Sequence, residues 1–414
     1  MNIDLQRWVD RWVGIPLCAA VSAFDAVIKR FKPPAELRAM AEAEPRAIVV
    51  ILLSEMGSLV LAHDMLKRLK TRYPNAPLHA LLFGKNREIL DLMGVIDPAN
   101  VHTVDDKSLT GLLTSLLRAV GELRRAHVDV AIDCELFSRI SSLLSYASGA
   151  AVRVGFYRHT QEGLYRGTHI NRRVPYNPYH HISAQFLALA RSIDSTAHPV
   201  SKLPVTTLTQ APPHVALAPG LVPGIAQRLA ADFPALRGKP LVLVYPGGGI
   251  LPIRAWPLDS YTALCAGLVA DGCAVAVIGL KDDQALARQL VANVQSASPG
   301  STVIDLTGYT RSIAELLALF HIAQLLVTND GGPGQFAALT PIWTLMLFGP
   351  ETPSLYAPHT PRCYSFYSQW PCSPCLTAYN HRASYCDGDN QCLKVIHPDT
   401  VLAKARECLL EVAA

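Results

Sequence analysis

The stretch "TNDGGPGQFAAL", Thr328–Leu339, places one acid and three glycines between two apolar segments. The run "AQLLV" precedes it, and "TPIWTLMLFGP" follows it. Glycine lets the backbone approach a ligand closely, and the free N–H groups at the start of a helix favour an anion. The pattern therefore predicts a buried strand, a ligand-binding turn and a helix. A tight turn in which Asp330 only caps the helix is the alternative.

An alternation of apolar strands and amphipathic helices runs outward from this stretch through most of the chain. It begins at Arg46 with "RAIVVILL" and restarts with "PLVLVYPGGG" after a segment with several prolines between Asp194 and Gly238. Strands that alternate with helices predict parallel sheets covered on both faces. We therefore expect an α/β protein with two Rossmann-like domains, whose strand-end loops face each other across a cleft.

These patterns divide the 414 residues into five expected segments. They are an N-terminal helical segment at 1–45, a first Rossmann-like domain at 46–195, a linker at 196–238, a second Rossmann-like domain at 239–360, and a cysteine-rich tail with a C-terminal helix at 361–414.

The composition narrows the classes of function. Half of the residues are hydrophobic, which is enough for two cores. Only 17% are charged and the formal net charge is +4, so a nucleic-acid partner receives no support. No loop matches the P-loop or the G-x-G-x-x-G fingerprint, which disfavours a P-loop enzyme or a simple dehydrogenase.

The N-terminal segment "RWVDRWVGIPLCAAVSAFDAVIKRF" is uncharged only from Val13 to Phe24, which we judge too short to span a membrane. A signal peptide is disfavoured by the acids that precede this run and by Pro16 within it. Two further interpretations stay open. The helix packs against the protein's own body, or it lies on a membrane surface with Trp8, Trp12 and Phe24 in the interface.

Several separated motifs, taken in order, resemble glycosyltransferase family 9, the ADP-heptose heptosyltransferases. They are "ILLSEMGSLVLAHDMLKRLKTRYPNA", "YPGGG…IRAWPLDSY", "VIGLKDDQALA", "LTGYTRSIAELLALFHIAQLLVTNDGGPGQFAAL" and "LFGPETPSLYAP". The match covers most of the chain from Arg46 to Pro358. The resemblance implies a GT-B architecture, with the nucleotide-sugar donor bound mainly by the second domain and the acceptor by the first.

The donor's diphosphate leaves as the glycosidic bond breaks, and cations and helix N-termini can neutralise it without a metal. Arg254 is our candidate cation, although the family usually has lysine there. The resemblance implies that Asp330 accepts hydrogen bonds from sugar hydroxyls and that the backbone of Gly331 to Gln335 faces the phosphates. Gln335 replaces the family's usual histidine, which puts the identity of the sugar in doubt. The other donor-binding candidates are Gly247, Gly248, Gly249, Trp256, Asp282, Asp283, Gly332, Pro333 and Gly334.

Asp282 and Asp283 follow the strand-like "VAVIGL" and have two interpretations. An acid after a Rossmann strand often contacts a ribose, and an acid at a helix start often caps it.

An inverting transferase needs a base to deprotonate the acceptor hydroxyl, and a carboxylate suits this role. In the family this base is an aspartate directly after the glycine of the first loop, where this chain has Ser58. Serine cannot act as the base unaided. We expect Glu55 in the same loop to take the role, with Asp133 and Glu135 of "IDCELFSR" next, unless catalysis is weakened or lost.

Six of the ten cysteines lie between Cys363 and Cys408. The spacing of four of them suits a tetrahedral structural site for zinc or iron, and disulfides or free thiols are the alternatives. The resemblance supports a metal, because some family members are thought to carry a cysteine-held iron in this region. The chemistry itself needs no cofactor. The four candidate ligands are Cys372, Cys375, Cys386 and Cys392.

The resemblance implies a cytoplasmic enzyme, either free or at the inner face of the cytoplasmic membrane, that moves heptose from ADP-heptose to a glycolipid such as the lipopolysaccharide core. The segment Phe156–His181 suits an anionic glycan through Arg158, Arg166, Arg172 and Arg173, or is a solvated basic loop. Two alternatives remain. One is a protein heptosyltransferase, and the other is a catalytically silent sugar-nucleotide-binding protein, suggested by Ser58.

Overall fold

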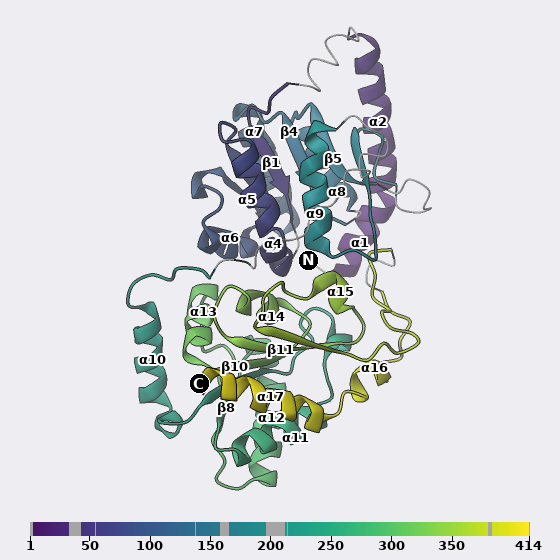
Figure 1. Ribbon diagram of the computed structural model, residues 1–414. Coiled ribbons are helices and arrows are strands. Elements are labelled where there is room, and N and C mark those ends of the chain that lie inside the picture. The colour runs from purple at the N-terminus through teal and green to yellow at the C-terminus, as the bar shows by residue number, and fades with distance from the viewer. Residues whose placement is uncertain are drawn as a thin grey trace. The chain divides into compact units, whose positions relative to one another are not determined.

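The chain forms two compact units, Met1–Thr209 and Gln210–Ala414, each built around a parallel six-stranded sheet (Figure 1). The computed structural model describes residues 3–32, 43–53, 55–136, 138–157, 165–195, 212, 214–379 and 383–413. The α/β class and the two Rossmann-like domains are thereby confirmed.

The sheet of the first unit has the order β3-β2-β1-β4-β5-β6, the Rossmann arrangement. All of its neighbouring strands run parallel, and its central strands are continuous apolar runs because helices cover both faces. The strands are β1 (Ile48–Ile51), β2 (Leu78–Phe83), β3 (Val101–Val104), β4 (Val130–Asp133), β5 (Val152–Tyr157) and β6 (Arg172–Pro175).

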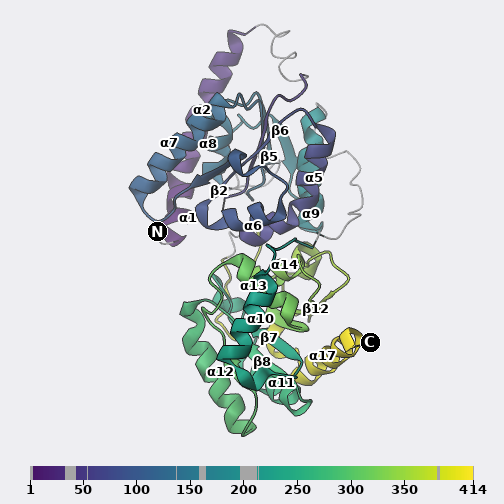
Figure 2. The same cartoon turned by 90° about the vertical axis from the view of Figure 1, so that its left-hand side faces the viewer.

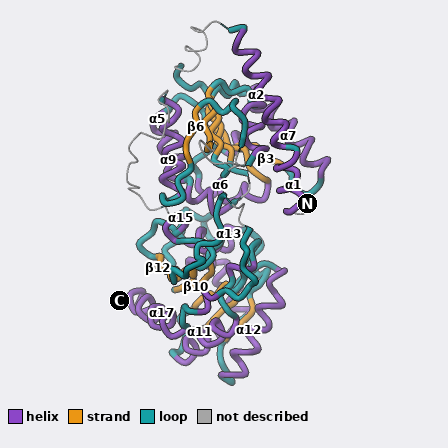
Figure 3. Tube along the Cα trace, turned by 90° about the vertical axis from the view of Figure 1, so that its right-hand side faces the viewer, coloured by secondary structure: helices purple, strands orange, loops and turns teal. Residues whose placement is uncertain are grey.

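Helices cover both faces of this sheet. Figures 2 and 3 show α5 and α9 on one side, with α7, α8 and the N-terminal helices on the other. The core on the second side joins strand residues such as Val49 and Ile51 to Leu123 of α7 and Leu144 of α8. The helices are α4 (Met56–Leu61), α5 (His63–Arg72), α6 (Arg87–Met93), α7 (Leu109–Arg125), α8 (Arg139–Ala147) and α9 (Ile182–Arg191).

The expected N-terminal helical segment is present as α1 (Ile3–Trp12) and α2 (Gly14–Arg30). One side of α2 packs against α8, and a Cβ added at Gly14 would lie 2.8 Å from the Cβ of Arg139. The expectation that this segment is too short to span a membrane was wrong on length, because the helical stretch Trp8–Arg30 has 23 residues and is apolar enough to cross one. Only 22% of the apolar stretch is buried within the protein.

The sheet of the second unit has the order β12-β11-β10-β7-β8-β9, again with parallel neighbours. Its strands are β7 (Leu241–Tyr245), β8 (Ala274–Val277), β9 (Val303–Asp305), β10 (Leu325–Asn329), β11 (Trp343–Phe348) and β12 (Cys363–Tyr367). Its helices are α10 (Leu221–Asp232), α11 (Leu258–Ala270), α12 (Gln284–Ala297), α13 (Ile313–Ile322), α14 (Gly332–Ala337), α15 (Pro353–Tyr356), α16 (Gln391–Lys394) and α17 (Pro398–Ala413).

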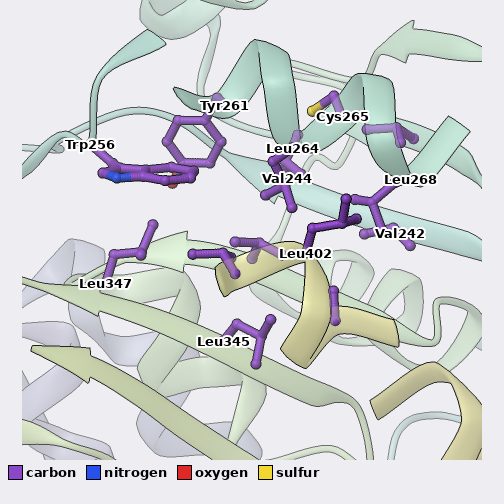
Figure 4. Close-up of a cluster of buried hydrophobic side chains, with 14 of the residues drawn as sticks. Val242, Val244, Trp256, Tyr261, Leu264, Cys265, Leu268, Leu345, Leu347 and Leu402 are labelled. Atoms are coloured by element: carbon purple, nitrogen blue, oxygen red, sulfur yellow. The ribbon is translucent and has the colours of Figure 1, made fainter. Parts of the chain in front are cut away.

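The core of the second unit lies between the sheet and helices α11 and α17 (Figure 4). Val244 and Leu345 of the sheet face Leu264 of α11 and Leu402 of α17, all of them buried. Burying each such side chain stabilises the fold by about 1.5–3 kcal/mol. A Cβ added at Gly267 would come within 2.4 Å of Leu402, so the lack of a side chain there lets α11 and α17 pack closely.

Two expected segment boundaries differ from the structure. The second half of the expected linker contains α10, which packs against α13 and belongs to the second unit, while 196–211 and 213 lie outside the described residues. The expected tail at 361–414 supplies an edge strand, β12, and the buried face of α17. Apolar residues on these elements complete a core, so neither segment is an appendage.

Candidate donor and catalytic site

The carboxyl ends of β7, β10 and β11 bring together three loops of the second unit. These strands are neighbours in the parallel sheet, so their ends meet at one edge. The loop after β7 holds the three glycines and a 3-10 turn, Pro252–Arg254. The loop after β10 holds Asp330, and the loop after β11 holds Glu351. Ligands of open α/β sheets bind at this edge.

Arg254 lies between two carboxylates at this edge. Its Nη2 is 2.7 Å from Oε1 of Glu351, and its Nε is 3.6 Å from Oδ2 of Asp330. The side chains of Asp330 and Glu351 are buried, while that of Arg254 is 14% exposed. Both Nε of Arg254 and Oδ2 of Asp330 are buried without a hydrogen-bond partner. These two atoms face each other in an ion pair that is too long for a hydrogen bond, so neither has its hydrogen-bonding capacity satisfied.

Burial and charge oppose each other in this cluster. Burial lowers the pKa of Arg254, but the carboxylates of Asp330 and Glu351 outweigh it, so the pKa is raised and the guanidinium stays charged. Burial raises the pKa of Glu351 to about 8, with the charge of Asp330 adding to the shift and Arg254 opposing it. The cluster at neutral pH therefore holds one cation and less than two full negative charges.

Asn329, at the end of β10, holds the glycine loop and the turn of Arg254 in place, and the sequence analysis missed it. Its fully buried amide nitrogen donates to the carbonyl of Gly247 at 2.9 Å and to that of Pro246 at 3.1 Å. Its Oδ1 accepts from the backbone N–H of Trp256 at 3.0 Å and from the hydroxyl of Tyr261 at 3.1 Å. The position directly before Asp330, at the end of a buried strand, was the signal that could have found it.

The glycine loop folds tightly against its own turn. A Cβ at Gly248 would lie 2.7 Å from the carbonyl oxygen of Leu251 and from Cα of Pro252, which are backbone atoms that cannot move aside. Gly249 has a φ of +61°, in the left-handed region that favours glycine. A Cβ at Gly247 would approach Asp283 Oδ1 at 3.0 Å. The glycines are therefore required by the shape of the loop, whatever ligand it binds.

Trp256 is a core residue, which corrects the expectation that it contacts the donor. It is 2% exposed, it packs edge-on against Tyr261, and its ring nitrogen donates to the carbonyls of Leu393 and Ile396 at 3.1 Å. Its polar atom is already paired, so the residue anchors the turn that carries Arg254.

The remaining donor candidates differ in what they contact. Asp282 is exposed, while Asp283 accepts from the backbone N–H of Leu280 at 2.8 Å, as a helix cap does. Gln335 is buried in α14 and donates to the carbonyl of Tyr356 at 2.7 Å, leaving its Oε1 without a partner. Gly331 to Gly334 form the turn and the first residues of α14, as the opening stretch predicts.

The first unit places Glu55 and Ser58 together at the start of α4. The hydroxyl of Ser58 donates to Oε2 of Glu55 at 2.9 Å, and both residues are half-buried. Leu53 of the same loop is fixed from two sides, because its N–H donates to Glu135 Oε1 at 2.6 Å and its carbonyl accepts from Asn86 at 2.7 Å. Glu135 therefore holds the loop in which Glu55 lies; Ser54 lies outside the described residues.

Asp133, our second candidate base, is fully buried and ion-paired with Arg166, which is fully buried as well. Its carboxylate also accepts from Ser141 at 3.0 Å and from the N–H of Glu135 at 3.1 Å. Burial raises the pKa of Asp133 to about 6, although Arg166 opposes the shift. A carboxylate with no exposed surface cannot reach an acceptor hydroxyl, so this structure corrects that expectation.

The basic residues expected to bind an anionic glycan are largely used inside the first unit. Arg166 also donates to the carbonyls of Ser138 and Phe156, and Arg172 is buried. Arg173 is half-buried and lies over the ring of Tyr157, while Arg158 lies outside the described residues. The interpretation as a solvated basic loop is equally wrong for the buried members.

Comparison with known proteins settles the family. The model of glycosyltransferase family 9 (heptosyltransferase) matches residues 116–385. The chain belongs to this family. It is 24% identical over 314 residues to lipooligosaccharide heptosyltransferase 2 of Haemophilus ducreyi, covering 75% of this chain and 85% of that protein.

Two solved structures share the fold. The first is ADP-heptose LPS heptosyltransferase II of Escherichia coli, with a TM-score of 0.68, 20% identity and coverage of 89% of this chain and 100% of the other. The second is a dodecameric iron-containing heptosyltransferase, TibC, in complex with ADP-D-β-D-heptose, with a TM-score of 0.51, 13% identity and coverage of 88% and 76%. The GT-B fold of a family 9 glycosyltransferase is thereby confirmed.

None of the cysteines of this family 9 enzyme forms a disulfide in the structure, so the disulfide alternative receives no support. Burial raises the pKa of Cys392 to about 11, and the neighbouring thiols of Cys375, Cys372 and Cys386 raise it further, which places the four close together. Among the described residues, however, no three His, Cys, Asp or Glu side chains are arranged to hold a metal ion. A metal at these cysteines stays a prediction.

Proposed function

We propose that this family 9 glycosyltransferase transfers heptose from ADP-heptose to a saccharide acceptor of a bacterial envelope glycolipid, such as the lipopolysaccharide core, at the cytoplasmic face of the membrane. The observation that carries the donor half is the buried cluster of Arg254, Asp330 and Glu351, with its unpaired donor and acceptor. A buried polar atom without a hydrogen-bond partner is costly, which favours a ligand that supplies the partner. The heptosyltransferase names of the relatives support the choice of sugar.

In this proposal Arg254 stabilises the diphosphate as it leaves. The bond between the anomeric carbon of heptose and the phosphate oxygen breaks, so negative charge grows on ADP, and a desolvated guanidinium interacts with it more strongly than one in water. Arg254 is held in place before the reaction by its contacts with Glu351 and Asp330. Oδ2 of Asp330, which receives no hydrogen bond within the protein, accepts one from a sugar hydroxyl.

Glu55 serves as the base in this proposal. The acceptor oxygen forms a bond to the anomeric carbon while its proton moves to the Glu55 carboxylate, and the proton later passes to solvent. Ser58 donates to Oε2 of Glu55 at 2.9 Å, which holds the carboxylate in place at the start of α4. The serine at the family's aspartate position thus orients a carboxylate supplied from one helical turn earlier.

The first experiment measures ADP release from ADP-heptose with a panel of lipopolysaccharide core acceptors, alongside calorimetric binding of ADP, UDP and GDP. Tight ADP binding with turnover supports the proposal, and a preference for UDP or GDP contradicts the choice of donor. ADP binding without turnover on any glycan or polypeptide would favour the catalytically silent alternative, which the Ser58 substitution motivates. Transfer to a polypeptide alone would make the enzyme a protein heptosyltransferase.

A Glu55→Gln variant tests the base. We expect turnover to fall by about 10²- to 10⁴-fold, since general base catalysis is lost, while ADP affinity stays unchanged. Asp64→Asn, on the half-buried face of α5, is the matched control and should keep its turnover. A fully active Glu55→Gln would move the role to Glu135.

A further inference from the structure

Helix α2 has two sides of opposite character. Its inner side contacts the first unit through Cys18, Ser22 and Asp25, all buried. Its outer side is apolar and exposed to solvent, which is unusual for a helix of a monomeric globular protein. Together with the end of α1, the exposed large apolar side chains are Trp8, Val9, Trp12, Val13, Ile15, Leu17, Phe24, Val27, Ile28 and Phe31.

The described acids of these helices face the protein body, whereas two of the arginines face solvent. Asp10 pairs with Arg139 at 3.2 Å and Asp25 with Arg153 at 3.1 Å, so both of these acids are neutralised against the protein body. The cations Arg11 and Arg30 are exposed near the two ends of the apolar surface. An apolar surface that is flanked by cations, and whose described acids Asp10 and Asp25 pair with the protein body, is complementary to an anionic lipid surface.

The aromatic residues point to the same partner. Trp12 is 61% exposed, Phe31 is 83% exposed, and the guanidinium of Arg11 lies 5.6 Å from the centre of the Trp12 ring. Tryptophan next to arginine is typical of the boundary between lipid headgroups and acyl chains, where one end of the ring is apolar and the other is hydrated.

A second apolar stripe lies on α7. Leu109, Leu113 and Leu117 are spaced four residues apart, which puts them on one side of the helix, and all three are exposed. Ser115, Ala119 and Leu123 of the same helix face the sheet. Helices α7, α8 and α2 cover the same side of the sheet, as Figures 2 and 3 show from opposite directions.

The inner contacts of α2 exclude a membrane-spanning arrangement in this fold. Insertion across a bilayer would separate Asp10 from Arg139 and Asp25 from Arg153, and both arginines are buried. Removing one partner of such a pair leaves a buried charge uncompensated, which is strongly destabilising. Ser22 adds a hydrogen bond from the N–H of Thr168 at 2.8 Å.

We propose that the outer surfaces of α1, α2 and α7 form a docking face on which the first unit lies flat on an anionic membrane. The helix axis is parallel to the bilayer plane, the apolar side chains enter the headgroup boundary by about 5–10 Å, and the cations meet anionic headgroups. A membrane-docking face is consistent with an acceptor that is a glycolipid. The proposal itself depends only on the exposure and charge of α1, α2 and α7, and its test needs no substrate.

The experiment is vesicle flotation of the full chain, with vesicles of phosphatidylethanolamine and phosphatidylglycerol compared with phosphatidylcholine alone. The test variant, Trp8→Ser/Trp12→Ser/Phe24→Ser, removes exposed side chains and leaves the inner contacts intact. The control, Tyr385→Ser/Val395→Ser/Leu410→Ser, removes three exposed apolar side chains from the second unit. We expect the test variant to lose about tenfold or more in vesicle affinity and the control to match the unaltered chain.

Two further variants sharpen the test. Leu113→Ser/Leu117→Ser on α7 should weaken binding by a smaller factor, and Arg11→Glu/Arg30→Glu should remove the preference for phosphatidylglycerol. An unaltered chain that does not bind vesicles, or a test variant that binds as well as the control, would overturn the proposal. So would sedimentation showing that the unaltered chain self-associates through this face and that the test variant does not.

The proposed docking face and the proposed function can fail separately. Transfer of heptose to a water-soluble core oligosaccharide should be the same in the test variant and in the unaltered chain. If no transfer occurs in either but vesicle binding follows the expected pattern, only the proposed function is lost. If transfer occurs and vesicles are not bound, only the docking face is lost.

Discussion

Each unit has an arginine–carboxylate cluster at the carboxyl ends of its parallel strands, and the two clusters are built differently. Arg166 in the first unit is fully buried and donates to Asp133, Ser141 and two backbone carbonyls. Arg254 in the second unit keeps some exposed surface, and its Nε lies 3.6 Å from Asp330 Oδ2 without forming a hydrogen bond. A cluster whose hydrogen bonds are satisfied holds a fold together, whereas one with unpaired atoms is suited to a ligand.

The largest expected effect is on the satisfied cluster. Arg166→Ala should lower the free energy of unfolding by about 3–5 kcal/mol, since it leaves Asp133 as an uncompensated buried charge. Urea denaturation measures the loss. The matched control is Arg166→Met/Asp133→Leu, which removes both charges and should recover most of the stability. A loss below about 1 kcal/mol in the single variant would show that the pair behaves like a surface ion pair.

The second effect is on turnover. Arg254→Ala should lose about 10²- to 10³-fold in kcat with ADP-heptose, the size expected for removing a contact to a leaving group. Its free energy of unfolding should change less than that of Arg166→Ala, because Arg254 has fewer satisfied contacts. Arg254→Lys keeps the charge and restores the residue usual in the family, so it should retain most of the activity. Unchanged turnover in Arg254→Ala would show that the Arg254 cluster does not serve the donor, and the contrast with the Arg166 cluster would be lost.

The third expected effect is a pH dependence of ADP affinity at the cluster of Arg254, Asp330 and Glu351. The raised pKa of Glu351, about 8, means that a second negative charge develops beside Arg254 as the pH rises through 8. Calorimetric ADP affinity should therefore fall above that pH, by about tenfold at most. Glu351→Gln should abolish this fall, and Glu411→Gln on α17 should keep it. A fall of equal size in Glu351→Gln would assign the titration to another group.

The same shift has a consequence for stability. The pKa of Glu351 is raised above its ordinary value of 4.5, so its contribution is fully present below pH 4.5 and is lost as the pH rises to about 8. In the range above pH 8, Glu351→Gln should unfold at a higher urea concentration than the unaltered chain.

The smallest expected effect on activity comes from the cysteines. Freshly purified, reduced protein should carry about one zinc or iron per chain, since four thiolates fill a tetrahedral site. Cys372→Ser should lose the metal and lower thermal stability, with turnover changed by about twofold at most because a filled structural site leaves no position for substrate. Cys273→Ser, a buried cysteine of the second unit outside this group, is the control for metal content. Elemental analysis that finds no metal would remove the prediction.

The strands and the donor loops could be predicted because their signals are local. Continuous apolar runs such as 241–245 and 325–327 are typical of strands inside a covered sheet, and the glycines that follow mark the turns. The order of motifs then predicted the family. The short strand β6 was missed because two of its four residues are arginines, which are seldom found in a buried strand.

The roles of single polar residues could not be predicted in the same way. Asp133 and Glu55 both follow apolar strands, and only the folded chain shows that Arg166 lies beside the former. Trp256 stands in the "IRAWP" motif that resembles the family's, yet its ring packs into a core that is completed by a helix about 140 positions later. Burial and pairing depend on contacts between distant segments, which a local pattern does not contain.

The amide of Asn329 has a consequence for engineering this enzyme. The side chain of Asn329 fixes the glycine loop, the turn of Arg254 and the end of β10. These three segments therefore form one structural unit. A donor loop grafted alone from another glycosyltransferase would lose its anchor or displace its neighbours. A change of sugar nucleotide would have to be introduced as one block that includes residue 329, and libraries that vary the loops independently would mostly sample broken sites.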